Sequence, residues 1–370
     1  MAASQARTVF NELLVLLQEA GDRFAGEERG VTEADDVAEG LRTLTHILQS
    51  GLYSHQEFDP DRPVFRRIVS PTRSFTGDNP DAVYYEAPIG AGQEYVVRGN
   101  TVGAVYTSFT MEAGAVDGKW ATGTSGVLRD NDIDIADDGS YEVRLGGSPD
   151  DRNWLGVPAE GGRLTTRHYF EWPEPAAALQ TLCVPLSIDA IVPAGPRPRW
   201  DDASVAAALQ RVVNHVRDKT IGAPVRPQAP APFVSTVANQ FAPPVVPGSM
   251  AFAAFDAAYS LAPYRIEPDE ALVITGRWPT CRFANVCLWN RFSQMYDYVN
   301  RSVSRNRANT TLEPDGSFRM ILAPRDPGLP NWLDTEGRTS GTIFWRYFLP
   351  EGEIETPQAQ VVKLADLPAN

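Results

Sequence analysis

The triplet Asn-Trp-Leu occurs twice in this chain of 370 residues, at 153–155 and at 331–333, both times among Pro, Gly and Asp residues. Four other landmarks repeat in the same order. Those spaced 177 residues apart are Gly99 and Gly276, Tyr106 and Phe283, and the tetrapeptides DGSY (138–141) and DGSF (315–318). The triplets themselves, and HYF (168–170) with RYF (346–348), are 178 residues apart. A repeat of this length is a whole domain, so the sequence predicts a duplication.

Each copy has the pattern of a β-domain. In the first copy, short apolar segments are broken by Gly, Pro, Asn and Asp, most clearly at 94–99, 103–111, 140–145 and 164–172, and a strand-like pattern resumes at about 250 and continues to the end. The thirty prolines and twenty-nine glycines also favour many turns over a helical bundle. We therefore predict a mainly β protein with two tandem β-sandwich domains that arose by duplication, at 61–193 and 250–370.

Helices are expected outside the two β-domains. Apolar residues recur at helical spacing in 8–24 and 32–50, which predicts a helical hairpin within 1–60. Residues 201–219 form the clearest helix, with Asp201 placed to cap its N-terminus. This linking helix and a Pro-rich segment, 223–248, occupy 194–249. Seven prolines predict that the segment is extended and lies on the surface.

Composition excludes several classes of function. A net charge of −14 argues against broad nucleic-acid binding, which needs a basic surface. The apolar run near the N-terminus, 10–17, contains Asn11 and Glu12 and is too short to span a membrane. Three cysteines without CxxC spacing predict small buried residues in a reducing compartment. We therefore expect a cytoplasmic protein without a membrane span.

Alternation of side chains along a strand separates two faces in both copies. One face carries Ala284, Val286 and Leu288, matched by Thr107, Phe109 and Met111, and is expected to be core. The other face mixes aromatic and hydrogen-bonding groups; its residues are Phe283, Asn285, Cys287 and Trp289, matched by Tyr106, Ser108, Thr110 and Glu112. This second face is either a solvated surface, which we favour, or the lining of a ligand site.

The last strand of each copy places a cationic group among apolar side chains. Thr342, Phe344, Arg346 and Phe348 are matched by Leu164, Thr166, His168 and Phe170, so that Arg346 and His168 are expected at equivalent points. A buried cation needs a partner, and Asp326 is a candidate for Arg346. A structural ion pair is favoured over a substrate clamp.

The Asn-Trp-Leu triplet has a structural and a functional interpretation. Asn tolerates turn geometry and binds nearby backbone, and Trp packs beneath the loop, which makes the triplet a staple. Direct ligand contact through Asn331 and Trp332 is the alternative. The one basic and aromatic neighbourhood of the acidic chain lies close by in sequence, around Arg291, Tyr296 and 301–307, and it suits a carboxylate, sulfate or sugar-like ligand.

Residues 322–352, LAPRDPGLPNWLDTEGRTSGTIFWRYFLPEG, preceded by FSQMYDYVNRSVSRN (292–306), resemble the bacterial family called domain of unknown function 1214. The first β-region, through GDNPDAVYYEAPI (77–89) and YVVRGNTVGAVYTSF (95–109), resembles sections of actinobacterial relatives and their companion family 1254. The resemblance covers most of 60–350. It implies jelly-roll-like β-sandwich domains with helical additions in a bacterial protein, and it carries over no catalytic residues.

Motifs for common chemistries are missing from the sequence. Neither a phosphate-binding loop, a dinucleotide fingerprint nor a nucleophile elbow is found. The four histidines lack metal-binding spacing, and we predict neither a metal nor a cofactor. The acidic stretch at 128–139 has carboxylates at alternate positions, as calcium ligands do, but it lacks the turn glycine of an EF-hand; an acidic solvated turn is favoured.

Two hypotheses for the function follow. The first is a small-molecule enzyme, a hydrolase or lyase, with its pocket in the second β-domain or between domains. His168 and Asp326 are the candidate catalytic residues. The candidate ligand-binding residues are Asn285, Trp289, Arg291, Tyr296, Asn331, Trp332, Trp345 and Arg346. The second hypothesis is a non-catalytic module that binds a carbohydrate, a lipid-like ligand or another subunit, including a second copy of the chain. Fold alone does not choose between them.

Overall fold

The protein is described by a computed structural model, which covers residues 4–75, 77–149, 152–224, 230–247 and 256–368. The chain forms two compact units. The first contains residues up to Arg73, then Tyr84–His168 and Cys183–Arg226. The second contains Pro227–Asn370 together with two earlier segments, Ser74–Val83 and Tyr169–Leu182.

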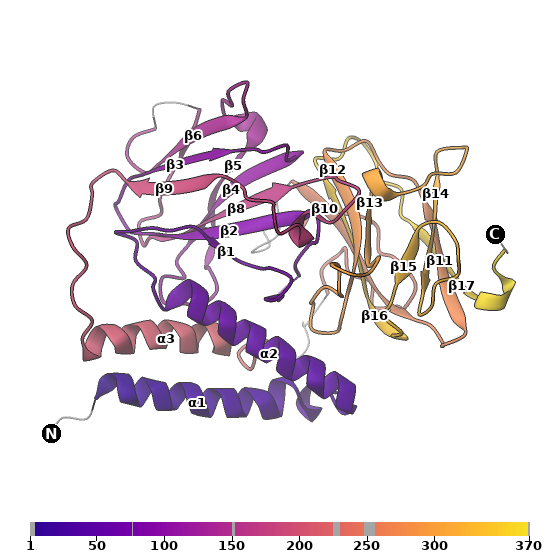
Figure 1. Ribbon diagram of the computed structural model, residues 1–370, viewed down its shortest axis with the longest axis horizontal. Helices are drawn as coiled ribbons and strands as arrows, with labels where there is room; N and C mark the ends of the chain where they lie inside the picture. The colour runs from indigo at the N-terminus through magenta and orange to yellow at the C-terminus, as the bar shows by residue number, and fades with distance from the viewer. Residues whose placement is uncertain (1–3, 76, 150–151, 225–229, 248–255, 369–370) are drawn as a thin grey trace. The chain divides into compact units, whose positions relative to one another are not determined.

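The first sandwich is built of two sheets (Figure 1). Its five-stranded sheet has the order β1 (Arg66–Arg67), β2 (Ala82–Ile89), β8 (Gly162–Tyr169), β4 (Tyr106–Ala113) and β5 (Gly123–Arg129). Its four-stranded sheet has the order β7 (Trp154–Leu155), β6 (Ser140–Leu145), β3 (Tyr95–Asn100) and β9 (Leu186–Ala190).

The second sandwich also has two sheets. One has the order β10 (Ala257–Arg265), β16 (Ser340–Phe348), β12 (Phe283–Trp289) and β13 (Ser304–Asn306). The other has the order β15 (Trp332–Asp334), β14 (Phe318–Ala323), β11 (Glu270–Gly276) and β17 (Gln358–Lys363). Apart from the short edge strand β1, each strand of the first sandwich has a counterpart at the same place in the second. The predicted mainly β fold with two tandem sandwiches is confirmed; the jelly-roll-like topology stays a prediction.

Three helices form a layer against the five-stranded sheet of the first unit (Figure 1): α1 (Gln5–Phe24), α2 (Ala34–His55) and α3 (Asp202–Lys219). Asp201 caps α3 as predicted, its side chain accepting a hydrogen bond from the Ser204 backbone N–H. The predicted end of α2 at residue 50 is wrong, since the helix continues to His55. Gly51 lies within the helix. A Cβ at this position would lie 3.1 Å from the His215 ring, so the glycine allows α2 to approach α3 closely.

Short 3-10 turns complete the regular structure: η1 (Glu27–Arg29), η2 (Asp130–Asp132), η3 (Ala176–Ala178), η4 (Arg307–Asn309) and η5 (Leu364–Asp366). Of the Pro-rich segment, residues 225–229 and 248 lie outside the described ones. In the described part, Val234 and Val245 make isolated bridges to β10. Phe233 is buried, and its ring centroid lies 5.6 Å from that of Tyr259. The segment therefore does not lie entirely on the surface, contrary to the prediction, because this side chain packs against β10. No helix in the described residues is long and apolar enough to cross a membrane.

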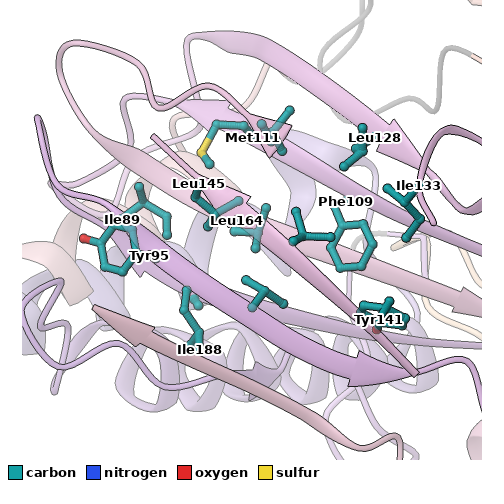
Figure 2. Packing of buried hydrophobic residues seen from close by; sticks show 14 residues of the cluster. Ile89, Tyr95, Phe109, Met111, Leu128, Ile133, Tyr141, Leu145, Leu164 and Ile188 are labelled. Atoms are coloured by element: carbon teal, nitrogen blue, oxygen red, sulfur yellow. The ribbon is translucent and has the colours of Figure 1, made fainter. Parts of the chain in front are cut away.

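The core of the first sandwich lies between its sheets (Figure 2). Phe109 and Met111 of β4 and Leu164 of β8 meet Tyr95 of β3 and Val143 of β6, and all five are fully buried. In the second sandwich, Trp345 of β16 stacks on Phe318 of β14 at 5.6 Å between ring centroids. Val286 and Leu288, predicted to be core, are also fully buried.

The Asn-Trp-Leu triplets are staples at equivalent places in the two sandwiches. Asn153 accepts a hydrogen bond from Asp134 N and donates to two backbone carbonyls, those of Asp134 and Glu142. Asn331 accepts from Thr311 N at 2.8 Å and likewise donates to two carbonyls, those of Thr311 and Arg319.

The tryptophans repeat the same arrangement. The indole N–H groups of Trp154 and Trp332 each donate to a backbone carbonyl, of Gly146 and Ala323 respectively. Each following strand pairs in parallel with its neighbour, β7 with β6 and β15 with β14. The staple interpretation accounts for every polar atom of both asparagine side chains.

Replacing Asn331 by Ala should lower the free energy of unfolding by about 2–4 kcal/mol, since it removes three hydrogen bonds and places Ala in left-handed backbone. Asn331 has φ = +59° and is buried. Denaturant unfolding of the variant measures the loss. The control is Asn300→Ala at an exposed position, where we expect a change below about 0.5 kcal/mol. Equal effects at the two positions would contradict the staple.

Candidate functional site

The candidate site is built on the face of the β10–β16–β12–β13 sheet that points away from the sandwich core. Asn285 of β12 stands between Arg346 of β16 and Asn306 of β13 in the strand register. Cys287 and Trp289 follow on the same face of β12, while Val286 and Leu288 point to the core. Strand alternation therefore places three polar side chains of three different strands next to one another.

This face is buried, so the prediction of a solvated surface is wrong. Asn285 and Asn306 are 0% exposed, and Arg346 is 4% exposed. The cover includes the segment Ser74–Val83, which the sequence places far away but which belongs to the same unit. The prediction failed because a strand pattern does not show which distant segment will cover a face.

Two carboxyl groups of the covering segment are fully enclosed. Asp81 Oδ2 accepts a hydrogen bond from Asn285 Nδ2 at 2.8 Å, and its Oδ1 accepts one from Asn306 Nδ2 at 3.1 Å. Asp78 Oδ2 accepts from Ser74 Oγ at 2.7 Å, and its Oδ1 accepts from Met295 N at 3.0 Å. Asp78 is 4% exposed and Asp81 is 1% exposed.

Loss of water changes the acidity of both groups. Burial raises the pKa of Asp81 to about 7, although the hydrogen bonds from Asn285 and Asn306 oppose the rise. Burial likewise raises the pKa of Asp78 to about 6, opposed by the bonds from Ser74 and Met295. The positive charge of Arg346 favours the ionised form of both carboxyls but does not cancel the effect of burial.

Arg346 is held from several sides. Its Nη2 donates to the carbonyl of Gly77 at 2.9 Å, and its Nη1 lies 3.4 Å from the sulfur of Cys287. The guanidinium carbon lies 4.2 Å from the ring centroid of Phe344 and 5.1 Å from that of Trp289. The cation thus has both hydrogen-bond acceptors and aromatic faces around it.

Gly77 is required where the covering segment meets Trp289. Its φ is +77°, and a Cβ at this position would lie 2.9 Å from the Trp289 ring. The indole N–H of Trp289 donates to the carbonyl of Asp78 at 3.1 Å. The glycine therefore allows the segment to approach closely enough to bring Asp78 over the sheet.

Two amide atoms in this cluster have no hydrogen-bond partner among the described residues. They are Oδ1 of Asn285, an acceptor, and Nδ2 of Asn79, a donor. The two side chains are joined, since Asn285 Nδ2 also donates to Asn79 Oδ1 at 2.8 Å. We call the group formed by Asp78, Asn79, Asp81, Asn285, Asn306 and Arg346 the aspartate cluster.

Three of the eight predicted ligand-binding residues come together at this cluster: Asn285, Trp289 and Arg346. Trp345 lies on the opposite face of β16, in the core. Asn331 and Trp332 form the staple. The hydroxyl of Tyr296 pairs with that of Tyr264 at 2.8 Å, and Arg291 is exposed.

The two predicted catalytic residues lie elsewhere. Asp326 is exposed in a turn, where its Oδ1 accepts a hydrogen bond from Gly328 N, and it does not pair with Arg346. His168 is fully buried in the first unit, 3.2 Å from the Thr166 hydroxyl. Burial lowers the pKa of His168 to about 3, which keeps the imidazole neutral at physiological pH.

The predicted equivalence of His168 and Arg346 is wrong. His168 Nδ1 lies 3.5 Å from the hydroxyl of Thr107, on the face that carries Phe109 and points to the core. Arg346 points away from the core of its own sandwich. In the first unit, the outward arginine is Arg167, which hydrogen-bonds to Thr110. A shift of one residue in the alignment exchanges the faces of a strand.

Other expectations concern cysteines and metals. The prediction that all three cysteines are buried is wrong for Cys183, which is exposed; Cys281 is partly buried and Cys287 buried. Burial raises the pKa of the Cys287 thiol to about 12.

In the acidic stretch 128–139, Asp130 is buried and its carboxylate accepts a hydrogen bond from Thr107 N, while Asp132 forms an ion pair with Arg129. No group of three or more His, Cys, Asp or Glu side chains in the described parts could hold a metal ion.

Asp78, Asn79 and Asp81 were not among the residues predicted from the sequence, although the two aspartates make the cluster acidic. The available signal was GDNPDAVYY (77–85), in which one glycine, two aspartates and an asparagine precede an apolar strand. Such polar residues also form ordinary turns, and the pattern does not tell which strand they will cover.

Comparison with solved structures supports the fold. The chain is similar to an uncharacterized protein from Burkholderia cenocepacia, with a TM-score of 0.83 and 28% sequence identity over 99% of this chain and 100% of that one. The VPA0106 protein from Vibrio parahaemolyticus gives a TM-score of 0.47 and 12% identity, over 87% of this chain and 98% of its own. No protein-family model and no curated protein matches the chain.

Replacing Asp81 by Asn should change how stability depends on pH. The pKa of Asp81 is about 7 in the folded protein against an ordinary value of 3.8, so the folded state binds more protons between these values. The free energy of unfolding therefore falls as pH rises from about 4 to 7. Wild type should lose stability relative to Asp81→Asn across this window, as measured by denaturant unfolding at several pH values. Parallel profiles would show that Asp81 ionises normally.

Proposed function

We propose that this protein is a small-molecule enzyme of hydrolase or lyase type, and that the aspartate cluster performs general acid–base catalysis. The observation that carries the proposal is the pair of enclosed carboxyl groups, Asp78 and Asp81, whose pKa values burial raises to about 6 and 7. A proton-transfer group works best when its pKa is near the working pH. Buried titratable groups with shifted pKa values gather at functional sites.

The charges of the cluster favour a neutral substrate. Arg346 contributes one positive charge, and Asp78 and Asp81 together contribute between one and two negative charges at neutral pH. The sum is close to zero, so neither a strong anion nor a strong cation is attracted. The unpartnered atoms Asn285 Oδ1 and Asn79 Nδ2 offer one acceptor and one donor. A hydroxyl or carbonyl compound supplies the matching groups.

The roles of the residues follow from their hydrogen bonds. Asn285 and Asn306 orient Asp81, which gives or takes the proton, while Arg346 stabilises negative charge that develops on an oxygen of the substrate. Asp81 is 1% exposed. A substrate reaches it only when the covering residues open locally, and closure then excludes water from the reaction.

The rival function, a binding module with an aromatic face, has less support. Its aromatic candidates, Trp289 and Phe344, are 6% and 8% exposed. Their rings lie 4.5 Å apart between centroids and flank the Arg346 guanidinium, so they are engaged inside the protein. An enclosed polar site with titratable groups is the arrangement that the enzyme hypothesis requires.

We also propose membership of the families 1214 and 1254 on the residues quoted above, and a cytoplasmic, bacterial setting. Three free thiols, at Cys183, Cys281 and Cys287, fit a reducing compartment.

The proposal is tested by incubating the protein with a panel of small neutral esters, lactones and polyols and following turnover by proton NMR. We expect kcat/KM for the substrate to depend on an ionisation near pH 7, and Asp81→Asn to lower it by about 10²–10⁴-fold. The matched control is Asp315→Asn, in an exposed turn of the same unit. Turnover that survives in Asp81→Asn would contradict the assignment.

A further inference from the structure

A second buried cluster lies in the first unit, on the face of the five-stranded sheet that the helices cover. Glu86 of β2, Glu112 of β4 and Arg163 of β8 point to this face, away from the core residues Met111 and Leu164. Arg163 Nη1 lies 3.0 Å from Glu86 and its Nη2 lies 3.3 Å from Glu112. Two carboxylates therefore share one guanidinium.

Helices contribute the other members of this cluster. Nε2 of His55, the last residue of α2, lies 3.0 Å from Nδ1 of His215 of α3, and both side chains are at most 2% exposed. Burial, together with nearby cations, holds the pKa of both imidazoles well below the ordinary range. The two rings therefore stay neutral at physiological pH and do not offset the carboxylates.

Lys219, the last residue of α3, is the unusual member. The chain has thirty arginines and only three lysines. Lys119 and Lys363 are exposed and form ion pairs with Asp117 and Asp269, whereas Lys219 is 8% exposed. Almost all positive charges of the chain are arginines, yet this buried position has a lysine. A buried lysine can lose its proton and an arginine cannot, so the two side chains differ in chemistry here.

The ammonium group of Lys219 faces an aromatic ring and lacks a hydrogen-bond partner. Its Nζ lies 3.7 Å from the ring centroid of Trp120, and no described residue accepts a hydrogen bond from it. Trp120 is fixed in place, because its backbone N–H donates to Asp218 Oδ2 and its indole N–H donates to the Asp218 carbonyl. The Lys219 amine therefore packs against the face of a fixed indole ring, and no polar group of the described residues accepts a hydrogen bond from it.

The environment makes the Lys219 amine neutral more often than an ordinary lysine. Burial and the positive charge of Arg163 lower its pKa to about 7, although Glu86, Asp218 and Glu112 oppose the change. His215 faces Lys219 as well, but it carries no charge. Buried lysines of this kind serve as nucleophiles toward carbonyl compounds.

We propose that Lys219 is a nucleophilic amine that forms a reversible imine with a small aldehyde or ketone, at a site separate from the aspartate cluster. The nitrogen lone pair attacks the carbonyl carbon to give a carbinolamine. This loses the former carbonyl oxygen as water and leaves a carbon–nitrogen double bond, with no change of oxidation state.

The surroundings stabilise the protonated imine that results. Glu86 and Glu112 outnumber Arg163 by one charge, which offsets the positive iminium. The face of the Trp120 ring attracts a cation at the same position. The carboxylate charge and the Trp120 ring therefore both suit a positively charged covalent product.

The test uses glycolaldehyde with sodium cyanoborohydride on the folded protein at pH 7, followed by peptide mass spectrometry. An ordinary lysine is about 10⁻³ neutral at this pH, and one with a pKa of about 7 is about half neutral. We expect Lys219 to be labelled at least about tenfold faster than Lys119 and Lys363, which serve as internal controls in the same molecule. The preference should disappear in guanidinium chloride, where all three lysines are exposed.

Three variants sharpen the result. Lys219→Arg replaces the amine by a permanently charged guanidinium that is not a nucleophile, so it should abolish the rapid labelling at this position, whereas Lys119→Arg should leave the rapid labelling of Lys219 unchanged. Asp81→Asn should also leave it unchanged, which separates this site from the proposed function. Should Lys219→Arg fail to fold, the ratio among the three lysines in wild type decides alone. Labelling of Lys219 in the folded protein no faster than that of Lys119 and Lys363 would overturn the proposal.

Discussion

Each sandwich buries both faces of one of its sheets, and this burial requires the polar side chains on the outward face to find partners within the protein. A sheet face away from the core ordinarily meets water, and its polar groups need no partner in the protein. Here the outward faces are covered, so an unpaired polar group is costly and charges must compensate one another. Asp81 with Asn285 and Asn306, and Arg163 with Glu86 and Glu112, are two solutions to the same problem.

The same burial that demands pairing also produces chemical reactivity. Desolvation makes the charged form of every group less favourable, so it raises the pKa of Asp78 and Asp81 and lowers that of Lys219. All three are thereby brought toward neutral pH, where a proton or a lone pair is readily exchanged. The two units share a strand order but place different groups on equivalent faces, which gives carboxylic acids in one and an amine in the other.

The sequence predicted the fold well because the repeat has local signals. Alternation in β4 and β12 separated the core residues Phe109 and Val286 from the outward ones, and Asp201 marked the start of α3. The site was predicted only in part. Asn285, Trp289 and Arg346 could be found because strand periodicity places them on one face, whereas Asp78 and Asp81 come from a segment more than two hundred residues earlier, and no local pattern records that contact. His168 was misplaced because the matching tripeptides HYF and RYF align one residue away from the register that preserves the face.

The proposed acid–base role depends on the ionisation of the buried aspartates in the second unit. Carbon-13 NMR of protein labelled at the aspartate carboxyl carbons, titrated from pH 3 to pH 9, measures this directly, with Asp78→Asn and Asp81→Asn used to assign the signals. We expect Asp81 to titrate near pH 7 and Asp78 near pH 6, because both carboxyl groups are buried. If both carboxyls instead titrate at about pH 4 or below, as exposed aspartates do, the cluster is an ordinary ionised network and the proposed acid–base role is contradicted.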